Sequence, residues 1–170
     1  MTSKPSSVCP VERAGSLDSR LRRLLQNPHR MLLPYVQEGM SVLDFGCGPG
    51  FFTVELAQLV GMSGHVIAAD LQDGMLEKVR NKVQGTELES RVQLHKCQSV
   101  QMGITRRLDF ILAFYVLHEL PDVAAFFSQL RPLVTVRGKM LVIEPPIHVS
   151  KARFNSMLEV AEAAGFARCV

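Results

Sequence analysis

Two kinds of hydrophobic pattern alternate along the chain. Short apolar runs end in small or acidic residues, and most are followed by a stretch in which apolar residues recur every three or four positions. The first pattern predicts buried strands and the second predicts amphipathic helices. The predicted strands cover residues 41–46, 65–70, 91–97, 108–116 and 139–145, and helices are predicted within 17–35, 51–61, 74–85, 122–134 and 151–166.

The order of these elements predicts the fold class. Strands that alternate with helices, and that are mostly apolar on both faces, form a parallel sheet covered by helices on both sides. We therefore expect a doubly wound, mostly parallel α/β domain over residues 17–170, preceded by a flexible arm at 1–16 that is rich in Ser, Pro and other small residues. Only residues 91–97 alternate between apolar and polar positions, as a half-buried edge strand does.

The end of the sequence predicts an open sheet edge. A sixth strand is expected to begin at Ala167, and no residues remain for a seventh, so the C-terminal strands are expected to be shortened. An uncovered edge strand invites pairing with another chain. We therefore expect this edge to be available for a homo-oligomer or for another partner chain.

Composition narrows the class of partner and the compartment. The 170 residues suit one domain, 47% of them are hydrophobic, and a net charge of +3 is too small to indicate nucleic acid binding. Four cysteines without a CxxC pair argue against a zinc site or a disulfide framework and favour reduced thiols. There is no secretory signal and no apolar run of the ~20 residues that cross a bilayer. A soluble, cytoplasmic protein is predicted.

A glycine-rich motif at residues 42–50, VLDFGCGPG, follows the first predicted strand. Its glycines alternate as GxGxG, whereas a dinucleotide fingerprint reads GxGxxG, and Pro49 removes an amide that a phosphate would bind. Asp44 would repel a diphosphate but attract a cation. Asp70, at the end of the second strand, lies where a carboxylate accepts hydrogen bonds from ribose hydroxyls. A ribose together with a cation indicates S-adenosylmethionine.

Three motifs in this order resemble those of the class I S-adenosylmethionine-dependent methyltransferases. Besides VLDFGCGPG they are IAADLQDGML (67–76) and DFILAFYVLHELPD (109–122), and the resemblance extends from about Leu32 to Phe166. It implies a Rossmann-like fold in which Asp44 helps to place the amino group of the cofactor, Asp70 holds its ribose, and apolar side chains flank its adenine. The implied cofactor site comprises Asp44, Gly46, Cys47, Gly48, Gly50, Asp70, Leu71, Met75, Gln98, Ser99 and Phe114.

One position departs from the pattern of the family. Its members often carry an aspartate after the third strand that binds the adenine amino group, and the corresponding residue here is Gln98 in KCQSV. A glutamine carbonyl oxygen accepts the same hydrogen bond. Adenine binding at this position is therefore still expected.

The acceptor is expected beside the loop after the fourth strand, which carries Tyr115, His118 and Glu119 as candidate catalytic residues. Methyl transfer is an in-line displacement, so a base is needed only for an acceptor such as a hydroxyl or a protonated amine. His118 is the best base candidate by residue type. The alternative is that His118 packs on the next helix and that Glu119 interacts with its dipole. The same rim receives Glu144, His148 and Arg153, which follow the fifth strand.

No metal site is predicted, because His118, His148 and Cys97 lack the spacing of a ligand pair. Cys47 and Cys97 both follow strands at the ligand edge. Binding of a thiophilic acceptor is therefore an alternative to the commoner role of buried structural thiols.

The sequence predicts an enzyme that transfers a methyl group from S-adenosylmethionine to a small-molecule acceptor. Helices within residues 17–38 are expected to lie over the site as a lid. The alternative is a non-catalytic S-adenosylmethionine-binding module that acts through a partner protein. A nucleotide-dependent oxidoreductase is disfavoured by Asp44 and Pro49.

Overall fold

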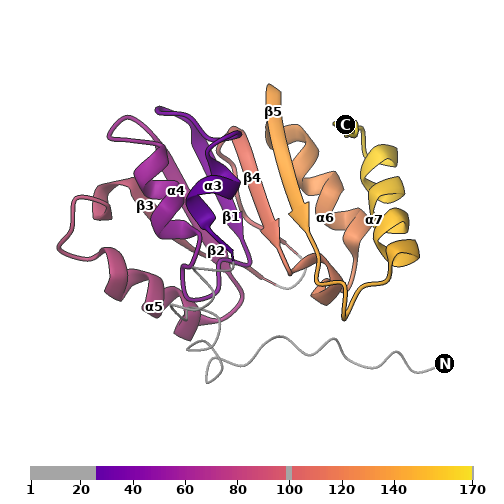
Figure 1. Ribbon diagram of the computed structural model, residues 1–170, viewed down its shortest axis with the longest axis horizontal. Coiled ribbons are helices and arrows are strands. Elements are labelled where there is room, and N and C mark those ends of the chain that lie inside the picture. The colour runs from indigo at the N-terminus through magenta and orange to yellow at the C-terminus, as the bar shows by residue number, and fades with distance from the viewer. Residues whose placement is uncertain (1–25, 99–100, 170) are drawn as a thin grey trace.

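The computed structural model describes residues 26–98 and 101–169 (Figure 1). The predicted arm at 1–16, the first part of the predicted lid and Ser99 of the predicted cofactor site lie outside the described residues. None of the helices in the two described ranges is long and apolar enough to cross a membrane.

The strands are β1 (Ser41–Phe45), β2 (His65–Asp70), β3 (Val92–Lys96), β4 (Leu108–Phe114) and β5 (Val134–Ile143). All neighbouring strands pair in parallel, which confirms the predicted fold class. Their order is β3-β2-β1-β4-β5, so the direction of strand addition reverses between β1 and β4. Ligands of doubly wound folds bind beyond the carboxyl ends of the strands at such a reversal.

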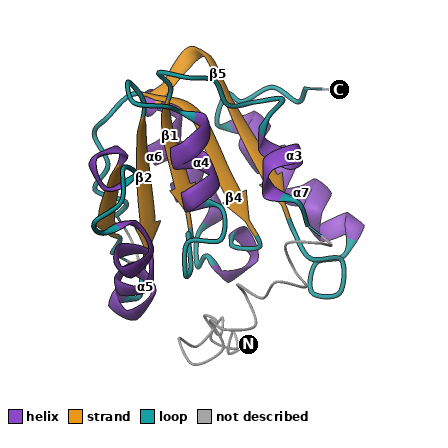
Figure 2. Ribbon diagram, turned by 60° about the vertical axis from the view of Figure 1, so that its left-hand side comes forward, coloured by secondary structure: helices purple, strands orange, loops and turns teal. Residues whose placement is uncertain are grey.

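Helices cover both faces of this sheet. They are α3 (Pro28–Leu32), α4 (Thr53–Leu59), α5 (Asp73–Val83), α6 (Val123–Leu130) and α7 (Lys151–Ala163), with short 3-10 helices η2 (Glu89–Arg91), η3 (Leu117–Glu119) and η4 (Arg131–Leu133). The first three α-helices pack on one face and α6 and α7 on the other (Figure 1 and Figure 2). The fold is therefore wound on both sides, as predicted.

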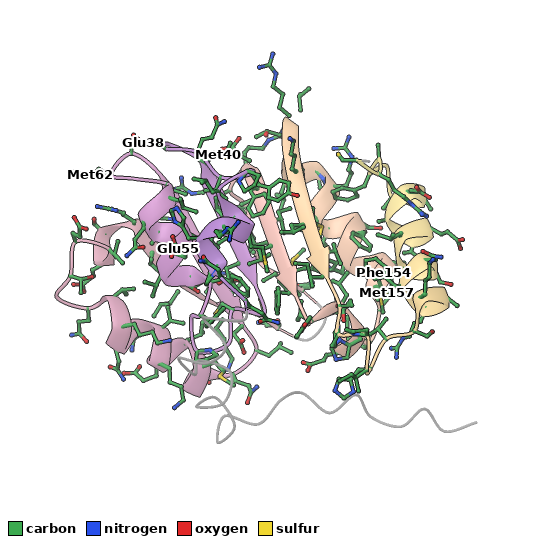
Figure 3. The ribbon with its side chains drawn as sticks, viewed as in Figure 1. Glu38, Met40, Glu55, Met62, Phe154 and Met157 are labelled. Atoms are coloured by element: carbon green, nitrogen blue, oxygen red, sulfur yellow. The ribbon has the colours of Figure 1, made fainter. Side chains whose placement is uncertain are left out.

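Alternating side chains on the strands separate two hydrophobic layers. Val42 belongs to the layer that contains Leu56 of α4, whereas Leu43 belongs to the layer beneath α6 and α7. Figure 3 shows Phe154 and Met157 of α7 pointing toward α6 and the sheet. The two layers fix β1 and β4, and the loops that follow these strands carry the candidate site.

β5 begins earlier than the predicted strand at 139–145. Val134 already pairs with Leu108, and the register shifts between Leu108 and Phe110. At Gly138 a Cβ atom would come within 2.9 Å of the Leu108 carbonyl oxygen, so the close approach of the two strands requires glycine there. The preceding helix consequently ends at Leu130 rather than at residue 134.

The predicted strand from Ala167 is wrong within the described part of the chain, because residues 167–169 form no regular structure. Arg131 Nε donates to the Gly165 carbonyl oxygen at 2.9 Å, and Arg168 forms an ion pair with Glu162. These contacts hold this segment beside η4 and α7 rather than along β5. Among the described strands, β3 and β5 are the two edges of the sheet.

Candidate functional site

A cavity of about 370 Å³ lies at the carboxyl ends of β1, β2 and β4, where the strand order reverses. Its walls come from the glycine loop after β1, the turn after β2, the loops after β3 and β4, and α6. Apolar and aromatic side chains form most of the lining, with a few carboxylate and amide groups among them. This combination is typical of a small-molecule site.

The glycine loop approaches the cavity with backbone that other residues rarely adopt. Gly46 and Gly48 have φ angles of 69° and 53°. A Cβ atom at Gly46 would lie 2.5 Å from Val116 Cγ2, whereas a Cβ atom at Gly48 would meet nothing within 4 Å. Gly46 therefore permits the loop to pack against the end of β4, and Gly48 leaves open space beside the cavity that it lines.

Asp70 joins the glycine loop to the end of β2. Gly48 N donates to its Oδ2 at 2.9 Å, and Gln72 N donates to its Oδ1 at 2.8 Å. Burial raises the pKa of Asp70, and these backbone hydrogen bonds oppose the shift. Since each carboxylate oxygen can accept a second hydrogen bond, Asp70 still has acceptor capacity toward the cavity.

Asp44 is the more deeply buried of the two carboxyl groups, with 2% of its surface exposed. Thr53 Oγ1, at the start of α4, donates to Asp44 Oδ2 at 2.6 Å. Burial raises the pKa of Asp44 to about 7, while the Thr53 bond lowers it and the nearby Asp70 raises it further. No positively charged group among the described residues contributes to this shift, so a cation in the cavity would favour the ionised form of Asp44.

The opposite wall combines the turn after β2 with the loop after β3. Leu71, Met75 and Gln98 all line the cavity, as the predicted adenine site requires. Gln98 N donates to the Gln101 carbonyl oxygen at 3.1 Å, which closes the loop after β3. Gln129 of α6 fixes the same loop, because its Oε1 accepts from Met102 N at 3.0 Å.

Tyr115 follows β4 in a strained conformation. It is the one residue other than glycine in the described ranges with a positive φ, at 59°. Its ring lies 4.1 Å from that of Phe114, and its hydroxyl accepts a hydrogen bond from Gln26 Nε2 at 3.3 Å. Such strain often accompanies functional sites, and here it places Tyr115 on the cavity wall.

His118 occupies a different position from its neighbours Val116 and Glu119, which line the cavity while His118 does not. His118 Nδ1 lies 2.5 Å from Glu144 Oε2. The Glu144 side chain is 2% exposed, and its Oε1 accepts from Leu117 N at 2.8 Å. The three groups join the end of β4 to the end of β5.

Two thiols lie at the ligand edge of the sheet, and the described residues also include possible metal ligands. No group of three or more His, Cys, Asp or Glu residues within 26–98 and 101–169 is arranged to hold a metal ion. Cys47 and Cys97 are free and buried. Burial raises the pKa of Cys97 to about 11 and that of Cys47 well above its usual value, so neither thiol readily becomes the thiolate that a thiophilic acceptor needs.

Most residues of the predicted cofactor site come together around the cavity. Those that line it are Asp44, Gly46, Cys47, Gly48, Asp70, Leu71, Met75, Gln98 and Phe114, and Tyr115 and Glu119 of the predicted catalytic residues join them. Gly50 does not line the cavity, because it faces Val79 of α5, where a Cβ atom would lie 3.1 Å from Val79 Cγ2.

Sequence reasoning missed Thr53 and the α6 side chains Phe126 and Gln129. Thr53 carries no motif of its own, and its hydrogen bond to Asp44 depends on how α4 meets β1. Phe126 and Gln129 belong to a helix whose apolar spacing indicates only a buried face. Their contribution to the cavity wall arises from the packing of α6 beside the loops after β3 and β4.

The chain matches the model of a family described as a methyltransferase domain over residues 36–165, a range that includes every residue lining the cavity. It is 29% identical over 110 residues to the demethylmenaquinone methyltransferase of Lactobacillus johnsonii, covering 64% of this chain and 45% of that protein. It is 29% identical over 129 residues to the ubiquinone/menaquinone biosynthesis C-methyltransferase UbiE of Shewanella oneidensis, covering 75% of this chain and 50% of that protein. The chain thus spans about half the length of these relatives.

Solved structures share the fold. A SAM-dependent methyltransferase from Aquifex aeolicus has a TM-score of 0.83 at 27% identity, and the match covers 94% of this chain and 90% of that one. A TehB-like SAM-dependent methyltransferase from Corynebacterium glutamicum has a TM-score of 0.66 at 19% identity, covering 92% of this chain and 84% of that one. The second likeness concerns the fold alone.

Proposed function

Because the chain belongs to the methyltransferase domain family, we propose that it transfers a methyl group from S-adenosylmethionine to a small aromatic acceptor that carries a hydroxyl group. The predicted resemblance to class I S-adenosylmethionine-dependent methyltransferases is confirmed by the family match and by the parallel fold shared with the Aquifex aeolicus enzyme. Since the chain spans about half the length of its relatives, its activity has to be tested on this protein itself.

One observation carries the proposal: two buried carboxyl groups flank the same glycine loop at the reversal of strand order. Asp70 retains acceptor capacity for ribose hydroxyls beyond its two backbone hydrogen bonds. Asp44 is buried, and a cation beside it would stabilise its ionised form. A ligand with a ribose, an ammonium and a sulfonium group fits this donor set, whereas a diphosphate would meet two acidic groups.

Other residues would hold the rest of S-adenosylmethionine. Leu71 and Met75 offer apolar contact to the adenine, and Gln98 offers a polar group at its edge. Gly48 leaves room beside the methionine portion. When bound, S-adenosylmethionine supplies a methyl group on a positively charged sulfur, and transfer leaves the electron pair of the broken bond on that sulfur. The residues of this chain contribute orientation and exclusion of water.

The acceptor proposal combines the wall of the site with the chemistry of the relatives. Phe114, Tyr115 and Phe126 line the cavity on the side of β4 and α6, and aromatic walls favour flat, apolar ligands. The relatives are named for demethylmenaquinone and for ubiquinone and menaquinone biosynthesis. A hydroquinone, the reduced form of such a ring, is the class of acceptor that these observations support.

Mass spectrometry tests this proposal directly. The protein is incubated with methyl-labelled S-adenosylmethionine and a 1,4-naphthohydroquinone that carries one short prenyl chain and one unsubstituted carbon on the same ring. We expect one labelled methyl group in the hydroquinone and none in the oxidised quinone, whose ring carbon is a poor nucleophile. Binding of S-adenosylmethionine without turnover on this probe or on other phenols would overturn the proposal and favour a non-catalytic module.

A further inference from the structure

The buried carboxylate of Glu144 has both of its oxygens occupied by the end of β4. Its Oε1 accepts from Leu117 N at 2.8 Å, and its Oε2 lies 2.5 Å from His118 Nδ1. The Glu144 side chain is 2% exposed and the His118 side chain is 19% exposed. A carboxylate this deeply buried and held by two partners has little freedom to rotate, so it fixes the imidazole ring.

This contact decides which nitrogen of His118 carries the proton. An ionised carboxylate has no hydrogen to donate, so the hydrogen bond requires a proton on His118 Nδ1. In the neutral ring the lone pair is therefore on Nε2. The same arrangement of carboxylate, imidazole and free Nε2 activates hydroxyl groups in hydrolytic enzymes of unrelated fold.

The position of the pair suits an acceptor rather than the methyl donor. His118 lies on η3 between cavity-lining residues of the β4 loop, but its own side chain is outside the cavity. Its ring stacks on that of His148 at a centroid distance of 6.1 Å, and its carbonyl oxygen accepts from Arg153. The pair thus occupies the rim between β4 and β5, beside the β4 side of the cavity, where we place the acceptor.

We propose that His118 Nε2 takes the proton from the acceptor hydroxyl and that Glu144 is the positioning residue that holds His118 in the required tautomer. This inference rests on the proposed function. The O–H bond breaks, its electron pair raises the nucleophilicity of the adjacent ring carbon, and that carbon bonds to the methyl group as the methyl–sulfur bond breaks. The ring carbon then loses its hydrogen as a proton to solvent, the hydroxyl is re-formed with the proton held by His118, and one proton is released overall.

The tautomer can be measured without any substrate. In nitrogen-15 NMR spectra of the neutral ring, wild-type His118 should show a protonated Nδ1 and an unprotonated Nε2. Glu144→Gln keeps an oxygen for Leu117 N and should lose this fixed pattern. His65→Ala, at the amino end of β2 and therefore at the opposite edge of the sheet, should retain it. A wild-type spectrum with the proton on Nε2, or a pattern that Glu144→Gln leaves unchanged, would overturn the assignment.

Kinetics with the prenylated naphthohydroquinone test the role of the pair. His118→Ala should lower kcat by about 100-fold or more, within the usual range for a lost general base, and added imidazole should restore part of the rate. Glu144→Gln should lower kcat by about tenfold or more with little change in KM, and the double variant should be no slower than His118→Ala, because the two residues act as one unit. His65→Ala is the matched control and should stay near the wild-type rate, because His65 pairs with Gln93 at the opposite edge of the sheet.

The possible outcomes separate the two proposals. If the wild-type protein methylates the probe while Glu144→Gln matches its kcat, or while the effects of the two substitutions simply multiply, the dyad is wrong and the methyltransferase remains. If the wild-type protein binds S-adenosylmethionine but methylates no hydroquinone, the proposed function is wrong, and the role of the pair that rests on it is wrong as well. Unchanged S-adenosylmethionine affinity in each variant shows that the rate changes do not come from a disrupted fold.

Discussion

Asp44 and Asp70 lie near the carboxyl ends of the neighbouring strands β1 and β2, yet their local chemistry differs. Asp70 accepts two backbone N–H groups, whereas Asp44 accepts a hydroxyl hydrogen from Thr53. Backbone donors and the charge of nearby Lys96 stabilise the Asp70 carboxylate, which can therefore accept hydrogen bonds from neutral hydroxyls. The buried Asp44 is satisfied only in part until a cation is near. This difference supports placing the ribose beside Asp70 and the positively charged methionine portion beside Asp44.

We predict that Asp70→Asn weakens S-adenosylmethionine binding by about 1–3 kcal/mol, because one acceptor of the ribose site becomes a donor. Isothermal titration calorimetry measures the change. Asp73→Asn is the matched control, since Asp73 is exposed and paired with Lys96 at 2.6 Å. Equal affinities of the wild-type and Asp70→Asn proteins would contradict the placement of the ribose beside Asp70.

The raised pKa of Asp44 predicts two pH effects of opposite sign. Without ligand, the stability that this group contributes is fully present below pH 3.8 and is lost as the pH rises through about 7, where the buried carboxyl ionises. The ligand cation prefers the ionised form. The ratio of wild-type to Asp44→Asn affinity for S-adenosylmethionine should therefore rise about tenfold from pH 6 to pH 8, as the ionised fraction does.

Comparison with Asp44→Asn at each pH cancels the titration of the ligand itself. Calorimetry at the two pH values supplies the four affinities. A ratio that stays constant, or that falls as the pH rises, would contradict the placement of a cation beside Asp44.

The two glycines that line the cavity should respond differently to substitution. In Gly48→Ala the added methyl group meets nothing within 4 Å. The free energy of unfolding should therefore fall only by the roughly 1–2 kcal/mol that a left-handed backbone costs alanine. Cofactor affinity should fall as well, because the methyl group occupies space beside the cavity that Gly48 lines. Gly46→Ala also forces its methyl group against Val116, so its stability loss should be larger. Thermal denaturation and calorimetry distinguish the two. A less stable Gly48→Ala than Gly46→Ala would contradict this account.

At the scale of elements, the sequence patterns predicted which segments form strands better than they predicted where the strands begin and end. The buried runs of β1, β2 and β4 could be predicted because apolar residues occupy both faces. The early start of β5 could not, since it depends on pairing of Val134 with Leu108 and on the close approach at Gly138. The absent strand after Gly165 likewise reflects tertiary contacts, above all the hydrogen bond from Arg131.

The N-cap of α7 is expected to contribute to the stability of the protein. Ser150 Oγ accepts from Arg153 N at 3.2 Å and caps this helix. Ser150→Ala should lower the free energy of unfolding by about 0.5–2 kcal/mol, because the amide loses its partner. Ser156→Ala is the control, since Ser156 lies within α7 and its hydroxyl bonds only to the preceding turn, so stability should change little. Denaturant titration compares the two, and equal losses would contradict the cap.

For the whole molecule, the reversal of strand order joins residues that are distant in sequence. The glycine loop, Asp70 and the β4 rim were predictable as one site because the ends of parallel strands meet at one edge. The partnership of His118 with Glu144 was not, although both residues were placed on the rim. It requires the register of β4 and β5 and the backbone donor of Leu117, neither of which the sequence shows.

The central claim is that the cavity beyond β1, β2 and β4 binds S-adenosylmethionine through its two acidic groups. A crystal structure of the protein with S-adenosylmethionine measures this most directly. The account predicts ribose hydroxyl oxygens within hydrogen-bond distance of the Asp70 carboxylate and the positively charged methionine portion on the side of Asp44 and Gly48. A ligand bound elsewhere, or a ribose that does not contact Asp70, would contradict it.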